Sequence, residues 1–282
     1  ECQVPHPPAL QGLESIYLEQ GKWKELYEAL DMQVDTLLSE SDQADVFARM
    51  ANVASMGLDD PEKSIELWNR VLDIKGDDPE ALEALGELYH GLERWSDLVD
   101  VLERGIMALM DDQDRIRMYE KLGRIWSEKL ERDGSALECW DNILAIEPGN
   151  VRALMEKAEI FTRMEEWEDL IDTLNQITDF GVATLEEMEL RAVYARQASV
   201  FTEKLDRPLD AIESWQRVLN IDPGDMEAIE SLEVLFKQEE MWEEYVQIRS
   251  RKAPLLEGHG EQIELWLDVA DVWAEKLLSP AN

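Results

Sequence analysis

The sequence has few of the residues on which enzyme active sites and disulfide-linked folds depend. It contains two cysteines, Cys2 and Cys139, and three histidines, His6, His90 and His259. Two cysteines in unrelated contexts form neither a disulfide framework nor a thiolate metal site, and three histidines in different repeats do not predict a zinc site. Phosphate-binding, dinucleotide-binding and nucleophile-elbow motifs are also absent from the sequence. We therefore expect no catalytic activity, no cofactor and no bound metal.

Basic residues and long apolar runs are scarce as well. Lysine and arginine together number 27 against 64 acidic residues, which gives a formal net charge of −37. This charge repels nucleic acid and anionic membrane surfaces, so neither is expected as a partner. No run approaches the length of a membrane-spanning helix, so no membrane insertion is expected. The acidity is compatible with a basic partner and with a salty habitat, and the composition leaves both open.

What the sequence does contain is enough apolar material to fold, since 45% of the residues are hydrophobic and ten are tryptophan. The sequence numbers of several aromatic residues differ by 72 or by 75, which indicates an internal repeat. Four such columns run along the chain: Trp23, Trp95, Trp167 and Trp242; Trp68, Trp140 and Trp215; Ala54, Trp126, Phe201 and Trp273; and Phe47, Tyr119, Tyr194 and Trp266. Because four independent sets of positions have the same spacing, the internal repeat is established.

One period is long enough for two helical hairpins. Apolar residues within it recur at helical spacing, as in Leu82, Leu85 and Tyr89, and proline- and glycine-containing breaks separate these segments. The interval from Trp167 to Phe201 is longer by three than the interval from Trp95 to Trp126, which places an insertion in the loop around 178–184. The predicted fold is an all-α, right-handed solenoid of stacked antiparallel helix pairs, continuous over residues 1–282. We expect hairpins at about 9–38, 43–75, 79–110, 114–147, 150–179, 185–222 and 225–257, and a half repeat at 261–278.

The repeat resembles the tetratricopeptide repeat, whose pattern has Leu-Gly-x-x-Tyr in the first helix, Ala-x-x-x-Phe in the second and a closing proline. The residues that carry this resemblance are Leu85, Gly86 and Tyr89; Leu122, Gly123, Trp126, Ala136, Trp140 and Pro148; and Ala198, Phe201, Ala211, Trp215 and Pro223. Alternate hairpins depart from the pattern, because they have leucines in the second helix and a tryptophan at the turn. The resemblance, which covers essentially the whole chain, is to a longer, bacterial-type protein of paired, non-identical hairpins.

Most of the tryptophans are expected to be structural residues of the hydrophobic core. Trp68, Trp140 and Trp215 occupy the position where the family buries phenylalanine, and Trp126 and Trp273 occupy the buried aromatic position of the first helix. The tryptophans at the turns are expected to wedge adjacent helices. The chain starts within a linker and stops inside an unfinished hairpin, without polar capping repeats. We therefore expect a piece of a longer protein.

The resemblance implies that the first helices of successive hairpins form a concave face on which a protein or peptide partner binds. Four of the sixteen arginines, Arg117, Arg124, Arg152 and Arg163, are expected to meet in the groove of the middle two hairpins. Because the planar guanidinium of arginine pairs with carboxylates, one interpretation is a basic spot that binds an acidic side chain or a chain terminus. The other interpretation is that these arginines balance the charge of neighbouring glutamates across the groove. The carboxylate clamp of chaperone-binding members is not expected, because Glu120 and Glu156 stand where basic residues would be needed. The candidate partner-binding residues are Asn52, Glu83, Glu87, Arg117, Arg124, Arg152, Met155, Glu159, Arg163 and Lys237.

Three functions remain open on this sequence. The first is a non-catalytic scaffold for protein–protein interaction. The second is a structural role, in which uncapped repeat ends associate chain to chain into a fibre or larger complex. The third is an accessory region of a larger enzyme or signalling protein. The sequence identifies neither the partner nor the compartment.

Overall fold

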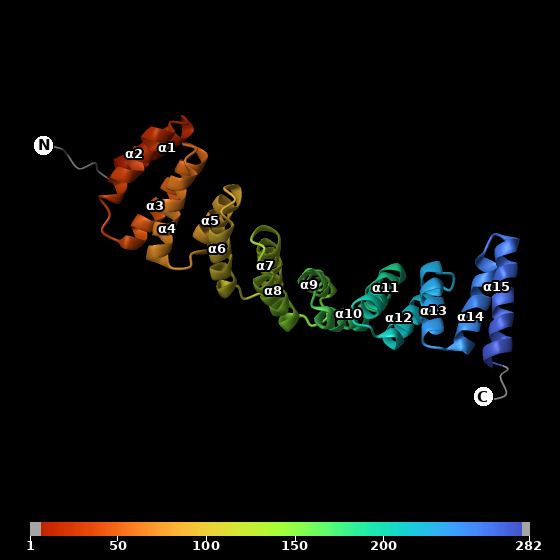
Figure 1. Cartoon of the computed structure of the whole chain (residues 1–282). Coiled ribbons are helices and arrows are strands. Elements are labelled where there is room, and N and C mark those ends of the chain that lie inside the picture. Colours follow the sequence, from red (N-terminus) through yellow and green to blue (C-terminus); the bar gives the residue numbers. More distant parts are fainter. Residues whose placement is uncertain (1–6, 278–282) are drawn as a thin grey trace. The chain divides into compact units, whose positions relative to one another are not determined.

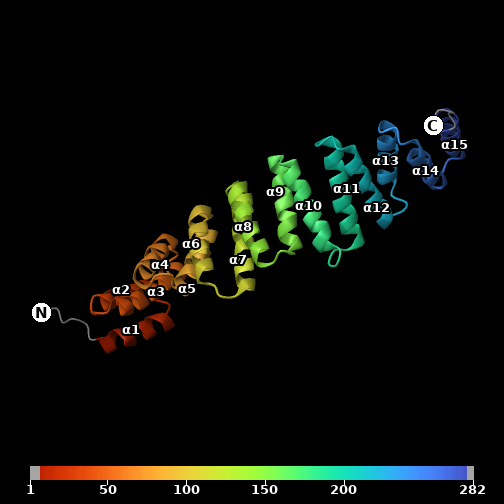
Figure 2. The ribbon, with the colours of Figure 1, turned by 90° about the horizontal axis from the view of Figure 1, so that it is seen from below.

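The computed structural model describes residues 7–277, and this part of the chain consists of helices joined by short turns, with no strand. Fifteen α-helices form seven antiparallel pairs and one further helix, which confirms the predicted all-α solenoid fold (Figures 1 and 2). The pairs are α1 (Pro7–Glu19) with α2 (Trp23–Val34), α3 (Glu40–Met56) with α4 (Pro61–Lys75), α5 (Pro79–Gly91) with α6 (Trp95–Ala108), α7 (Asp112–Arg124) with α8 (Asp133–Ile146), α9 (Val151–Met164) with α10 (Trp167–Gly181), α11 (Glu187–Glu203) with α12 (Pro208–Ile221), and α13 (Met226–Gln238) with α14 (Trp242–Lys252); α15 (His259–Val272) follows. Short non-α turns extend α7 (Ile125–Lys129), α14 (Ala253–Leu255) and α15 (Trp273–Leu277).

The chain divides into two compact units, Glu1–Asn142 and Ile143–Asn282, with the boundary inside α8. In the first unit, one core joins residues from α2 to α8, including Leu30, Met50 and Leu98, each at most 1% exposed. In the second, a core joins α9 to α14, and a smaller cluster packs α15 against α14. Each helix thus contributes its apolar face to a core shared with its neighbours in the chain. The continuous array predicted for residues 1–282 stays a prediction.

The helices begin where the sequence provides capping groups. Asp78, Asn150 and Asp225 stand at the same position of successive double hairpins. Each accepts a hydrogen bond from the amide three residues later, at 2.9–3.1 Å. Such a cap satisfies an amide that has no partner within the helix. Prolines occupy the first helical position of α4, α5 and α12, where the missing amide costs nothing.

All seven hairpins of the described chain turn through a residue in the left-handed backbone region. These residues have φ between 51° and 64° and are Gly21, Asp59, Glu93, Glu131, Glu165, Asp206 and Glu240. Glycine adopts this conformation without steric cost, whereas residues with a Cβ are strained there. Only the first of the seven turns therefore has the residue type that its backbone favours.

The predicted insertion lies at the end of α10 and in the loop that follows it. α10 has 15 residues where α6, in the same register, has 14. The loop from Val182 to Glu186 is two residues longer than the loop Leu109–Asp111 after α6. Together these account for the whole insertion, and both loops are followed directly by the first helix of the next hairpin.

The core tryptophans confirm part of the sequence prediction and correct another part. Trp68, Trp140 and Trp215 are at most 4% exposed, as expected. Trp126 is half-buried against the first core. The expectation that Trp273 is buried is wrong, because it is 46% exposed, like Trp266 in the preceding turns at 49%. No helix of the described part of the chain packs over this face of α15, which explains the exposure.

The tryptophans at the turns each pack on the hairpin that follows. Trp95 lies beneath the Nζ of Lys129, at 5.3 Å from the ring centroid. The same contact recurs between Lys204 and Trp167 at 5.0 Å and between Lys276 and Trp242 at 5.1 Å. In the first double hairpin the lysine is replaced by Gly57, where an added Cβ would lie 2.4 Å from the Trp23 ring. These rings are cation–π partners as well as wedges.

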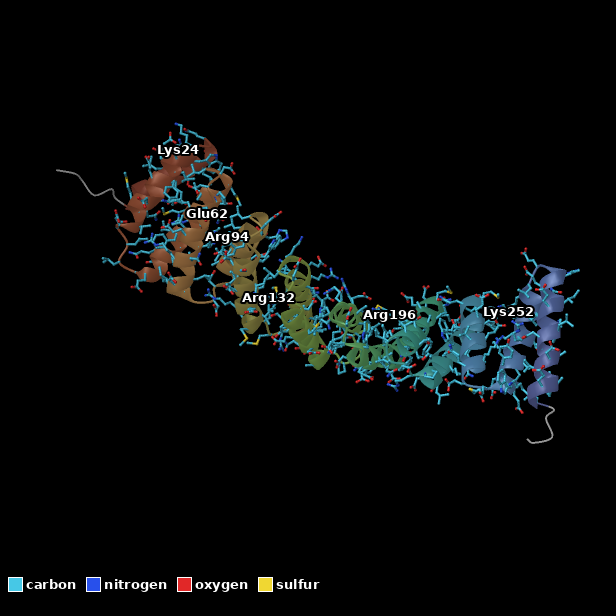
Figure 3. All side chains as sticks on the ribbon, in the orientation of Figure 1. Lys24, Glu62, Arg94, Arg132, Arg196 and Lys252 are labelled. Atoms are coloured by element: carbon cyan, nitrogen blue, oxygen red, sulfur yellow. The ribbon has the colours of Figure 1, made fainter. Side chains whose placement is uncertain are left out.

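A partly buried ion-pair network lies among the last three helices of the second unit. Glu233 of α13, with 11% of its side chain exposed, accepts from Arg249 at 3.2 Å and from Lys252 at 2.8 Å. Arg249 also pairs with Asp268 of α15, and the Tyr245 hydroxyl donates to the same carboxylate at 2.8 Å. Lys252 is labelled in Figure 3. The network joins α13, α14 and α15, so its loss would loosen the last hairpin.

Candidate partner-binding surface

The ten residues predicted to face a partner are all on first helices and none is buried. Asn52 is on α3, two are on α5, two on α7, four on α9 and one on α13. Asn52, Arg124 and Met155 are half-buried and the rest are exposed. Their positions are therefore compatible with a binding surface. The ten residues are divided between the two units, with α3, α5 and α7 in the first and α9 and α13 in the second.

Two of the predicted arginines line the same pocket. This pocket, of about 290 Å³, lies along α7 and is closed at one side by His90 of α5 and Trp95 of α6. Arg117 and Arg124, two helical turns apart on α7, face it together with Glu120, Lys121, Ile125, Glu128 and Lys129. Four basic residues against two acidic ones line it, in a protein with a net charge of −37. We call it the α7 basic pocket.

The aromatic wall of the α7 basic pocket is held in place by its neighbours. The rings of His90 and Trp95 meet edge to face at a centroid distance of 5.5 Å. Lys129 covers the Trp95 ring, as described above. Arg117 is paired with Asp114, one turn earlier on α7, and its side chain is 72% exposed. An exposed pair of this kind contributes little to stability, so Arg117 can exchange its partner for an incoming carboxylate at small cost.

Sequence reasoning missed the aromatic wall. The sequence places His90 at an outward position near the end of a first helix but gives it no aromatic partner, and it predicts Trp95 only as a wedge between helices. The signal that could have found them is the register, because both residues border the turn between α5 and α6, at the level of the α7 arginines.

A second pair of predicted residues also shares a pocket. Asn52 of α3 and Glu87 of α5 line a hollow of about 280 Å³, which Trp68 and Leu88 line as well. Glu83 is exposed one turn earlier on α5, and Lys237 is exposed near the end of α13. Neither lines this hollow.

The four predicted residues of α9 form a separate group in the second unit. Arg196 of α11, which is labelled in Figure 3, pairs with Glu159 at 2.6 Å and also donates to the Thr162 hydroxyl at 2.6 Å. This pair joins two neighbouring first helices, but Arg196 is not one of the four predicted arginines, so the charge balance expected for those four stays a prediction. Arg152, Met155 and Arg163 lie on the same helix. The hypothesis that these two arginines meet those of α7 in one groove stays a prediction, since the two helices belong to different units.

Within residues 7–277, no group of three or more His, Cys, Asp or Glu side chains is arranged to hold a metal ion. None of the helices described is both long and apolar enough to cross a membrane. The acidic run at Asp111–Asp114 caps α7, because the Asp111 carboxylate accepts from the amides of Gln113 and Asp114. The thiol of Cys139 is buried, and burial raises its pKa to about 12, which makes it a poor nucleophile.

Comparisons with known proteins give one match to a family model and several matches to solved structures. The family model of the tetratricopeptide repeat matches residues 81–116, which span α5, α6 and the start of α7. A comparison with curated protein sequences gives no match. The structure of Naa15/Naa10 bound to HypK-THB has 11% identity and a TM-score of 0.56, and the match covers 98% of this chain and 43% of that one. YrrB, described as a TPR protein with an unusual peptide-binding site, has 17% identity and a TM-score of 0.39, with 67% and 91% covered. A tetratricopeptide repeat protein from Parabacteroides merdae has 12% identity and a TM-score of 0.40, with 93% and 98% covered.

Repeated antiparallel helix pairs that share a core with their neighbours define a helical solenoid protein. Solenoids use their extended surfaces to bind other proteins. Within this class, residues 81–116 match the tetratricopeptide repeat, and they lie in one of the seven helix pairs and the start of the next.

Proposed function

We propose that this protein is a non-catalytic scaffold that binds an acidic segment of a partner protein on the surface of its first helices. The α7 basic pocket is the anchor. Arg117 and Arg124 pair with a side-chain or terminal carboxylate of the partner, and the His90 and Trp95 rings pack on the apolar part of the same residue.

The observation that carries the proposal is the concentration of positive charge in the α7 basic pocket. The net charge of −37 repels an acidic segment from the protein as a whole, whereas the four basic residues of the pocket attract its carboxylates. Arginine forks bind carboxylates with two parallel hydrogen bonds, which gives orientation as well as affinity. A volume of about 290 Å³ is sufficient for one or two side chains.

The test uses a fluorescein-labelled acidic peptide, Gly-Ser-Leu-Asp-Glu-Leu-Glu with a free terminal carboxylate, and fluorescence anisotropy. The variant Arg117→Ala/Arg124→Ala is expected to weaken binding at least tenfold, because two charge-assisted contacts of about 1 kcal/mol each are lost. A second peptide has Gln and Asn in place of the acidic residues and an amidated end. It is expected to bind the wild-type protein no better than the acidic peptide binds the double variant.

The matched control is Arg115→Ala/Arg132→Ala. It removes the same charge from the same unit, but neither residue lines the α7 basic pocket. We expect less than a twofold change in affinity for this control. An equal loss in both double variants would mean that the peptide responds to net charge alone, and the pocket proposal would then be rejected.

A second candidate function, end-to-end association, is favoured by α15. Its outer face exposes Ile263, Trp266, Leu267 and Trp273 by 46–61% each. A second copy of the chain could cover this apolar surface with a helix. Sedimentation velocity across a hundredfold range of concentration tests this candidate, with Leu267→Glu as the variant that should abolish any growth in size. A constant sedimentation coefficient for the wild-type chain would exclude it.

A further inference from the structure

A groove in the first unit lies between α6 and the hairpin of α7 and α8. It has a volume of about 800 Å³ and is lined by Tyr119 and Trp126 from the first helix of the hairpin, by Glu138 and Asn142 from α8, and by Asp100 and Glu103 from α6. We call it the α6–α8 groove. It lies apart from the α7 basic pocket, with which it shares no lining residue.

In the other two hairpins of this register, an arginine covers the aromatic ring that corresponds to Tyr119. The second helices contain Glu66-Leu-Trp-Asn-Arg70 and Glu213-Ser-Trp-Gln-Arg217. The guanidinium of Arg70 lies 4.1 Å from the ring centroid of Phe47, and that of Arg217 lies 5.5 Å from the ring centroid of Tyr194.

The contacts of Arg217 show which groups bind an arginine at this position of the second helix. Its Nη2 donates to Glu213 Oε1 at 2.8 Å while the guanidinium covers the Tyr194 ring. Both contacts favour the charged form, and the hydrogen bond to the carboxylate is the main cause of the raised pKa of Arg217. A ring below and a carboxylate one turn away thus form a receptor for a guanidinium group.

In the α6–α8 groove this receptor is present and the arginine is missing. The corresponding segment is Glu138-Cys-Trp-Asp-Asn142, so asparagine replaces the arginine while Glu138 and Tyr119 keep their places. Asn142 turns back on its own helix, where its Nδ2 donates to the main-chain carbonyl of Glu138 at 2.9 Å. It therefore leaves the ring and the carboxylate to the groove.

The charges around the α6–α8 groove are also unbalanced. Burial, followed by the neighbouring carboxylates of Asp100 and Glu138, raises the pKa of Glu103. Arg104 lines the groove too, but its guanidinium is directed to Asp77 at 2.8 Å. A cation placed in the groove would relieve the repulsion among the three carboxylates.

We propose that the α6–α8 groove binds an arginine side chain of a basic segment in a partner protein, which takes the place that Arg70 and Arg217 fill in the other hairpins. The guanidinium covers Tyr119 and pairs with Glu138. The groove is larger than one arginine side chain, so the residues next to that arginine lie in it as well. This site is independent of the acidic-segment pocket on α7, and either can be wrong without affecting the other.

The experiment is a titration with N-acetyl-arginine amide, monitored by the indole ¹⁵N–¹H signals of the ten tryptophans. The Trp126 signal, which Trp126→Phe identifies, is expected to shift in a saturable way. N-acetyl-citrulline amide has the same shape without the charge and should cause no shift. N-acetyl-lysine amide has the charge without the planar group and should bind at least threefold more weakly.

The decisive variant is Asn142→Arg, which restores the residue of the other hairpins. Its own guanidinium should occupy the receptor and abolish the shift, whereas Asn142→Gln should leave it unchanged. The ligand comparison keeps the test valid if Asn142→Arg does not fold by circular dichroism. Equal shifts with citrulline and arginine, equal affinities for lysine and arginine, or a shift that survives in folded Asn142→Arg would each overturn the proposal.

Discussion

The left-handed turn residues lead to a quantitative prediction about stability. Glu93, at φ 56°, joins α5 to α6 in the position that Gly21 occupies at the turn between α1 and α2, one period earlier in the sequence. The side chain of Glu93 is exposed. Replacing Glu93 by Gly therefore removes the strain caused by the Cβ without removing a packed side chain.

The magnitude follows from two opposing effects. A left-handed conformation costs a residue with a Cβ about 1–2 kcal/mol relative to the right-handed one. The greater freedom of glycine in the unfolded chain reduces the benefit by about 0.5–1 kcal/mol. We expect Glu93→Gly to raise the free energy of unfolding of the first unit by about 0.5–1 kcal/mol, which for this size corresponds to a rise of roughly 1–4 °C in Tm.

The assay is urea unfolding followed by far-ultraviolet circular dichroism. The matched control is Glu83→Gly in the middle of α5, where the residue is exposed and the backbone is helical. Glycine costs about 1 kcal/mol in a helix interior, so the two variants should move the midpoint in opposite directions. If Glu93→Gly lowers the midpoint as the control does, the turn is not strained and the reasoning is refuted.

Three further predictions concern the ion-pair network, the buried thiol and the tryptophan contacts. Glu233→Ala removes the carboxylate that Arg249 and Lys252 share but leaves each a second partner, Asp268 and Glu230, so it should lower the stability of the second unit by about 1–2 kcal/mol, seen as faster amide exchange in α13 and α14; unchanged exchange would show that the network contributes nothing. In a Cys2→Ser background at pH 8, Cys139 should react with iodoacetamide roughly a thousand times more slowly in the folded chain than in urea, because burial raises its thiol pKa from 9.0 to about 12. Comparable rates would contradict its burial. Lys129→Met should cost about 0.5–1 kcal/mol through loss of the contact with the tryptophan ring, whereas Lys121→Met should cost less; equal costs would remove the cation–π contribution.

The helices, their pairing and the position of the insertion can be predicted from the sequence, because a repeated core requires the same apolar positions in every copy. The burial of Trp68, Trp140 and Trp215 follows from the repeat for this reason. The prediction for Trp273 is wrong, since a repeat pattern does not tell whether a neighbour covers the face. The repeat pattern predicts which residue type occupies a position. Whether that residue is buried depends on whether an adjacent helix packs over it.

The site is predictable only in part. Outward positions on first helices follow from helical periodicity, which places Arg117 and Arg124 on one face of α7. Their pocket depends on the turn of the preceding hairpin, where His90 and Trp95 meet the helix. Contacts across hairpins depend on how far one pair is offset from the next, which spacing along the chain does not specify. For the same reason, the sequence does not predict that lysines cover the tryptophans at the turns, although these lysines recur with the same spacing as the tryptophans.

The tryptophan–lysine contacts restrict how such a chain can gain or lose repeats. Trp95, Trp167 and Trp242 each stand in an odd-numbered hairpin, and the lysines that cover them stand in the even-numbered helix pair or helix that follows. Deletion or duplication of one hairpin would place two tryptophan-bearing hairpins, or two lysine-bearing hairpins, next to each other. A tryptophan ring would then be left without a lysine to cover it. Removal or addition of a whole period in the part of the chain that begins with Trp95 keeps the ring of each turn tryptophan beside a lysine. The heritable module of this protein is therefore the double hairpin, and changes in its length should be compatible with folding only in steps of that size.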